Sequence, residues 1–184
     1  MPKRLYSKDY VVVSANYRFL SEAKVEEIWD DAAKAVAWVF DNIEKFGGDP
    51  KKIFVAGHSA GGYLTCMVGF NPALLAKYGR KNTDLRGIIP MSAQVTEHYG
   101  VRHSLKDPDH HMLPKINPRA PLYYIGNKLP PVEIVCGDRK YDVPCRVIEN
   151  ELLVASLRAM NKRDVEFYEI PGADHGGCLE PGLG

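Results

Sequence analysis

The stretch Lys52-Ile53-Phe54-Val55-Ala56-Gly57-His58-Ser59-Ala60-Gly61-Gly62 decides the fold of this chain. Its first half, residues 52–56, is a short apolar run that predicts a strand. The small residues that follow predict a tight turn, and the apolar residues from about 60 to 70 predict a helix. A strand that leads directly into a helix is typical of sheets whose strands run parallel.

Further strands and helices alternate around this stretch. The sequence predicts strands at 10–15, 87–91, 131–136 and 165–170, the last with the alternation of an edge strand, and helices at 25–46 and 147–160. Residues from about 93 to 130 are rich in Pro, His and Asp and predict an irregular cap or insertion. We therefore expect a single domain over residues 1–184 of the α/β class. Its architecture should be a three-layer α/β/α sandwich with a mostly parallel sheet and helices on both faces.

Composition and charge exclude several classes of protein. The chain has 184 residues, of which 45% are hydrophobic and 26% charged, and its net charge is +1. This length suffices for one domain with a sizeable core. The balanced charge argues against nucleic acid or an anionic membrane as the main partner. No apolar run reaches the ~18 residues of a membrane span, and no signal peptide is visible, so the default expectation is a cytoplasmic protein.

No pattern in the sequence indicates a metal or a cofactor. The cysteines Cys66, Cys136, Cys145 and Cys178 match no zinc spacing, and we expect them to be reduced. A group of polar residues in the irregular segment contains metal-ligand types, but turn chemistry explains it more simply: His103, Asp107, Asp109, His110 and His111. No G-x-G-x-x-G or Walker pattern follows the first strand, which argues against a flavodoxin-like nucleotide-binding module.

Ser59 is the candidate nucleophile. Gly57-His58-Ser59-Ala60-Gly61 fits the pattern G-x-S-x-G between a predicted strand and a predicted helix. In that context a sharp, strained turn presents the serine hydroxyl at the carboxyl edge of a sheet, so its neighbours must be small. The same turn places the Ala60 N–H at a helix N-terminus, where it can stabilise an oxyanion.

The stretch from Phe46 to Gly62 resembles the esterase/lipase branch of the α/β-hydrolase superfamily. That branch includes hormone-sensitive-lipase-like carboxylesterases and acetyl- and feruloyl-esterase-like enzymes. Tyr10 to Arg18 is also similar to a strand of this family. The resemblance runs from about Tyr10 to the end of the chain and is weaker at 93–130. It implies a serine hydrolase that cleaves small-molecule carboxylic esters through an acyl-enzyme on Ser59.

His175 is the candidate general base. It follows the last predicted strand, in Pro171-Gly172-Ala173-Asp174-His175, and this turn is similar to the closing motif of the family. The chain order of serine, acid and histidine is the order expected of the fold. His58, beside the nucleophile, is expected to point elsewhere on the turn.

The acid partner should follow the strand at 131–136. Gly137-Asp138-Arg139-Lys140-Tyr141-Asp142 resembles a family loop whose second acid is usually the triad member, but Lys140 occupies that place. A lysine cannot accept a hydrogen bond from an imidazole. We therefore expect Asp138, directly after the strand, to be the acid, with Asp142 as the alternative. The unused aspartate should be a cap or loop residue.

The family usually carries a His-Gly-Gly-Gly-type segment before the strand that resembles Tyr10 to Ala15, and this segment completes the oxyanion hole. Met1 lies too close to Tyr10 for the chain to contain it. This predicts an N-terminally shortened hydrolase, in which a homodimer would cover the exposed edge at Tyr10. Two alternatives stay open: a catalytically impaired scaffold, and a hydrolase of other acyl substrates such as aryl formamides or peptides.

The irregular segment allows two interpretations. Its apolar side chains either line an acyl or alcohol pocket or pack over the sheet: Tyr99, Met112, Leu113, Ile116, Tyr123, Tyr124 and Ile125.

Overall fold

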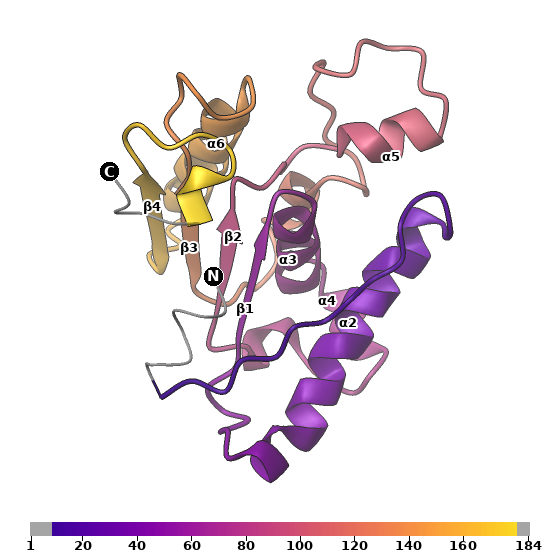
Figure 1. The fold of residues 1–184 in the computed structure, drawn as a ribbon, viewed down its shortest axis with the longest axis vertical. Coiled ribbons are helices and arrows are strands. Elements are labelled where there is room, and N and C mark those ends of the chain that lie inside the picture. The colour runs from indigo at the N-terminus through magenta and orange to yellow at the C-terminus, as the bar shows by residue number, and fades with distance from the viewer. Residues whose placement is uncertain (1–8, 180–184) are drawn as a thin grey trace.

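A computed structural model describes residues 9–179 (Figure 1). Its elements, in chain order, are α2 (Val25–Asn42), η1 (Ile43–Phe46), β1 (Phe54–His58), α3 (Ala60–Phe70), α4 (Pro72–Ala76), η2 (Asn82–Asp84), β2 (Gly87–Met91), α5 (Tyr99–Ser104), η3 (Pro121–Tyr124), β3 (Val132–Cys136), α6 (Arg146–Ala159), β4 (Val165–Glu169) and η4 (Gly177–Leu179). Every element predicted after residue 25 is present close to its expected bounds.

Within the described residues, the sheet has four parallel strands in the order β1-β2-β3-β4. Val55 of β1 lies opposite Ile88 of β2, and Ile134 of β3 lies opposite Phe167 of β4. The alternating pattern of β4 predicted an edge strand, and β4 is at an edge. Because all strands are parallel, their carboxyl ends meet at one edge of the sheet, which is where such folds place their chemistry.

One hydrophobic core joins the sheet to its helices. Ile88 and Ile134 are fully buried in it, together with Met67 of α3 and Leu157 of α6. On the other face of the sheet, side chains such as Phe54 are about half exposed. The predicted α/β fold with a parallel sheet is confirmed. Within residues 9–179 the helices that pack on the sheet lie on one of its faces (Figure 1).

The strand predicted at residues 10–15 is wrong. The segment forms no strand, and Tyr10 and Val13 are 59% and 45% exposed. A β-branched run forms a strand only where a neighbouring strand offers its hydrogen-bonding edge, and β1 pairs only with β2 in the described part of the chain. Three residues after this segment, the chain is tied to α2 by Arg18, whose guanidinium donates two hydrogen bonds of 2.8 Å to Asp31. The homodimer stays a prediction.

The segment predicted to be irregular, from about 93 to 130, contains the short helices α5 and η3 and otherwise consists of turns. In Figure 1 it projects beyond the carboxyl ends of the strands, beside α3. No helix within residues 9–179 combines the length and the apolar character needed to cross a lipid bilayer.

Candidate active site

Ser59 occupies the turn between β1 and α3 in a strained backbone conformation. Its φ is 55° and its ψ is −115°, a region that residues other than glycine rarely adopt. Two backbone hydrogen bonds of 2.9 Å hold it there, from Ser59 N to the Met91 carbonyl and from Tyr63 N to the Ser59 carbonyl. The neighbouring strand and the first turn of α3 therefore enforce the conformation.

The glycines around Ser59 allow the backbone to pack closely. A Cβ at Gly57 would collide with the Gly61 carbonyl and would lie 2.7 Å from Thr65 Oγ1. A Cβ at Gly62 would lie 2.9 Å from the Cβ of Ala93. These contacts explain why the turn requires glycine at Gly57, the first glycine of the G-x-S-x-G pattern, and at Gly62, which directly follows the pattern, whereas a Cβ at Gly61 would meet only the Tyr17 hydroxyl at 4.0 Å.

The structure brings Ser59 and His175 together and adds Asp142. His175 Nε2 is 2.9 Å from Ser59 Oγ, and His175 Nδ1 is 2.6 Å from Asp142 Oδ1. A carboxylate only accepts, so Nδ1 carries the hydrogen and Nε2 is free to accept the hydrogen of the serine hydroxyl. The three residues follow β1, β3 and β4, so the parallel sheet brings them to the same edge.

The Asp142 carboxylate is fully buried and well supplied with donors. Ser92 Oγ donates to Oδ2 at 2.6 Å, the Gly137 N–H to Oδ2 at 2.9 Å and the Val143 N–H to Oδ1 at 2.7 Å. Burial acts to raise the pKa of Asp142, but the hydrogen bonds from Ser92, His175 and the two N–H groups outweigh it and hold the pKa below its ordinary value. Asp142 is therefore an anion positioned to orient His175.

The expectation that Asp138 is the acid must be corrected. Its carboxylate accepts hydrogen bonds from the N–H groups of Lys140 at 2.9 Å and Gly172 at 2.8 Å, which lower its pKa, and it does not contact His175. The chain turns directly after Asp138, since the N–H groups of Tyr141 and Asp142 both bond to the Asp138 carbonyl. That turn brings the fourth residue on, Asp142, back to the carboxyl edge of the sheet.

Three further side chains support the site, and sequence reasoning missed their roles. Ser92, at the carboxyl end of β2, donates to Asp142. His58 does not point away, as was expected, because its Nε2 lies 2.6 Å from the carbonyl oxygen of His175. Cys178 Sγ lies 3.3 Å from the same oxygen. The one sequence signal for Ser92 is that it directly follows the strand predicted at residues 87–91.

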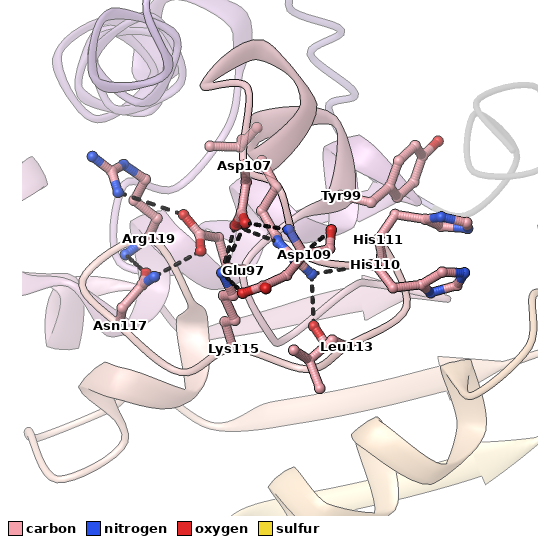
Figure 2. Close-up of polar contacts among 12 residues, drawn as sticks. Glu97, Tyr99, Asp107, Asp109, His110, His111, Leu113, Lys115, Asn117 and Arg119 are labelled. Atoms are coloured by element: carbon pink, nitrogen blue, oxygen red, sulfur yellow. Dashed lines mark hydrogen bonds and ion pairs between the residues drawn. The ribbon is translucent and has the colours of Figure 1, made fainter.

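The irregular segment is organised around the buried guanidinium of Arg102, whose side chain is 3% exposed. Arg102 donates to Asp107 Oδ2 at 2.9 Å and to the carbonyl oxygens of Asp109, His111 and Leu113 at 3.2, 3.2 and 2.6 Å. Figure 2 shows these acceptors converging from the surrounding loop. A loop without strands or long helices thus obtains a defined shape from one side chain.

Lys115 and Glu97 extend this network. Lys115 Nζ lies 2.7 Å from a carboxylate oxygen of Asp107 and 2.7 Å from one of Asp109. The buried Glu97 accepts a hydrogen bond of 2.7 Å from Asn117. Both aspartates that were considered as metal ligands are therefore engaged by cations of the chain. No cluster of three metal-ligating side chains occurs within residues 9–179.

An apolar cavity of about 110 Å³ opens beside Ala60, at the start of α3. Its walls come from three segments: Tyr17–Leu20 with Val25 and Ile28, then Tyr63 and Leu64, and finally His98 with Val101. The apolar residues proposed from the irregular segment do not line it. Leu113, Ile116 and Tyr123 are about half exposed instead, while Tyr124 and Ile125 pack against the core.

Known proteins are similar to this chain in sequence and in fold. A family model described as BD-FAE matches residues 1–84. Esterase LipC of Mycobacterium tuberculosis is 28% identical, over 94% of this chain and 46% of its own length. Esterase LipQ of the same organism is 26% identical, over 94% of this chain and 44% of its own length. The butyrate-bound structure of Est2, an esterase of the Planctomycetes species Thermogutta terrifontis, has a TM-score of 0.71 at 26% identity and covers 95% of this chain and 66% of Est2.

The parallel sheet and the strained serine turn at its carboxyl edge are features of the α/β-hydrolase fold, which the likeness to Est2 also shows. The sequence matches point more narrowly, since LipC and LipQ, which are similar to this chain over most of its length, are both esterases. The chain spans slightly less than half the length of LipC and LipQ.

Proposed function

We propose that this chain hydrolyses carboxylic esters through an acyl-enzyme formed on Ser59. The observation that carries the proposal is the hydrogen-bonded row from Ser59 through His175 to the buried Asp142. A serine hydroxyl is a weak nucleophile until a neighbouring base accepts its proton, and this row supplies the base and the group that orients it.

The reaction would proceed in two steps. Ser59 Oγ attacks the ester carbonyl while His175 Nε2 takes its proton, and the same proton then passes to the leaving alcohol as the C–O bond breaks. In the second step His175 takes a proton from water, the resulting hydroxide attacks the acyl-enzyme, and Ser59 leaves with the proton returned. Asp142 stabilises the imidazolium in both steps.

Ala60 is the residue that we assign to the oxyanion. It is the first residue of the eleven-residue helix α3, whose first N–H groups have no partner within the helix. The positive end of the helix dipole adds to the attraction of an N–H for a developing negative charge. Removing one donor of this kind typically costs ~10²–10³ in kcat, so the Ala60 N–H is a substantial part of the proposed mechanism.

The apolar cavity beside Ala60 supports a short acyl group as the preferred substrate part. Its volume of about 110 Å³ accommodates three or four groups of water size, at ~30 Å³ each. This matches an acyl chain of roughly two to four carbons. Two structures of Est2 hold propionate and butyrate, whose carbon chains fall in this range of lengths.

A fluorophosphonate probe tests the proposed nucleophile. The folded chain should be labelled once, on Ser59, and Ser59→Ala should not be labelled. Labelling of Ser59→Ala at the rate of the wild type would contradict the assignment. A folded wild-type chain that resists the probe would count against hydrolase activity in this chain.

A series of p-nitrophenyl esters tests the proposed acyl pocket. The value of kcat/KM should be highest for acetate to butyrate and should fall steeply for octanoate. Leu20, which lines the cavity, offers a matched pair of variants. Leu20→Ala should shift the preference toward longer chains and Leu20→Trp toward acetate. If neither variant changes the preference for acyl-chain length, the acyl chain binds outside this cavity.

A further inference from the structure

His58 contacts the main chain of the candidate general base directly. Its Nε2 lies 2.6 Å from the carbonyl oxygen of His175. A carbonyl oxygen only accepts, so Nε2 carries the hydrogen and donates it. The two imidazole rings also pack together, with centroids 4.5 Å apart and planes inclined by 47°. The residue before the nucleophile thus touches the residue that would activate it.

We infer that His58 is a positioning residue for the proposed ester hydrolysis, because its Nε2–H holds the main chain of His175 so that the ring stays between Ser59 and Asp142. The inference rests on the proposed function. Asp142 fixes the ring through Nδ1, whereas His58 fixes the backbone that carries the ring. Cys178 reaches the same carbonyl at 3.3 Å, but a thiol is a weak donor.

The turn that carries His175 needs such a restraint. It follows the edge strand β4, and its neighbours Asp174 and Gly176 are exposed. Gly176 and Gly177 after it add backbone freedom. A displacement of about 1 Å in a catalytic group can cost ~10²-fold in rate. The hydrogen bond from His58 links this exposed turn to the rigid junction of β1 and α3.

The charge state of His58 suits this role. Burial lowers the pKa of His58 below its ordinary value, against the opposing effect of its hydrogen bond to the His175 carbonyl. The ring is therefore neutral at pH 7. A neutral neighbour does not repel the imidazolium that His175 becomes when it takes the serine proton.

Two substitutions separate the donor from the ring. His58→Gln keeps an N–H donor at a similar reach, and His58→Phe keeps the ring without the donor. With p-nitrophenyl acetate, His58→Phe should lower kcat by about 10- to 100-fold with little change in KM, and His58→Gln should stay within about threefold of the wild type. Thermal unfolding of both variants, and Ser59→Ala in the same assay, serve as controls.

A second measurement does not require turnover. The proton on Nδ1 of His175, which Asp142 accepts, should give a separate low-field NMR signal that His58→Gln preserves and His58→Phe shifts or broadens. An unchanged kcat and an unchanged signal in His58→Phe overturn the inference, as does an equal loss in both variants. A wild-type chain without ester hydrolysis counts against the proposed function, and the NMR comparison still decides the role of His58.

Discussion

Asp142 and His175 meet at 2.6 Å between Oδ1 and Nδ1, and this contact joins the loop after β3 to the turn after β4. Asp138, four residues earlier, forms hydrogen bonds only within the loops. Asp142→Asn should therefore lower kcat by ~10³–10⁴, since an amide no longer fixes the tautomer of the imidazole. Asp138→Asn should stay within about tenfold of the wild type. Steady-state hydrolysis of p-nitrophenyl butyrate measures both.

The pair of variants is a matched test, because both replace a carboxylate by its amide in the same loop. A larger loss of kcat in Asp138→Asn than in Asp142→Asn would restore Asp138 as the acid.

Ser92 should contribute through Asp142 alone. Its hydroxyl donates to Asp142 Oδ2 at 2.6 Å, and its φ is 42°, which glycine adopts without strain. Ser92→Gly should lower kcat by roughly 10-fold through the lost hydrogen bond, with a thermal midpoint close to that of the wild type. In a chain that already carries Asp142→Asn, Ser92→Gly should cause almost no further loss of kcat. Full additivity of the two losses would show that Ser92 acts by another route.

Arg102 should be the most sensitive residue of the irregular segment. Its side chain is 3% exposed and serves four acceptors, so Arg102→Met leaves three carbonyl groups and Asp107 without this donor. We expect the thermal midpoint to fall by about 5–10 °C, and residues 105–116 to become sensitive to a protease. Lys115→Met is the control, since the Lys115 side chain is 28% exposed. An equal effect of both substitutions would refute the central role of Arg102.

His98 should make the stability of the fold depend on pH. Its Nδ1 accepts a hydrogen bond from the Gly100 N–H at 3.1 Å, at the start of α5, and burial lowers its pKa from 6.5 to about 4. Between these values the unfolded chain binds a proton that the folded chain does not bind, so stability falls as the pH falls. The loss from pH 7 to pH 5 should be about 2 kcal/mol.

Urea unfolding of His98→Asn at both pH values measures this contribution. Asparagine keeps a helix-capping acceptor but does not titrate, so its loss of stability between the two pH values should be smaller by that amount. The exposed His103 lies on the same short helix and supplies the control substitution, His103→Asn. An identical pH dependence in His98→Asn and the wild type would contradict the prediction.

Local patterns predicted much of the fold. The helix Ala60–Phe70 and the strand Gly87–Met91 have the bounds that the sequence indicated. Their signals lie within each segment, as apolar runs and turn residues. The failed strand at residues 10–15 depended on a partner, and pairing is a property of the whole sheet rather than of the segment.

The site was harder to predict wherever it depended on the path of a loop. Ser59 and His175 follow strands directly, and parallel topology brings them to one edge. The choice of acid depended on the turn at Asp138, which moves Asp142 four residues further along into the site. The Asp-x-Lys sequence at residues 138–140 is compatible with an Asx turn, in which the carboxylate is occupied by a nearby N–H, and that signal could have favoured Asp142.

Ser59 and His175 come from opposite edges of the described sheet, with β2 and β3 between their strands. The proposed catalysis therefore depends on the pairing of all four strands rather than on one loop. Edge strands open locally at lower free energy than the core does. If β4 separates transiently from β3, the base leaves the nucleophile while α2, α3 and the core stay intact. Heat would then abolish the proposed ester hydrolysis before it melts the helices, so the loss of hydrolysis should begin at a lower temperature than the loss of the circular dichroism signal.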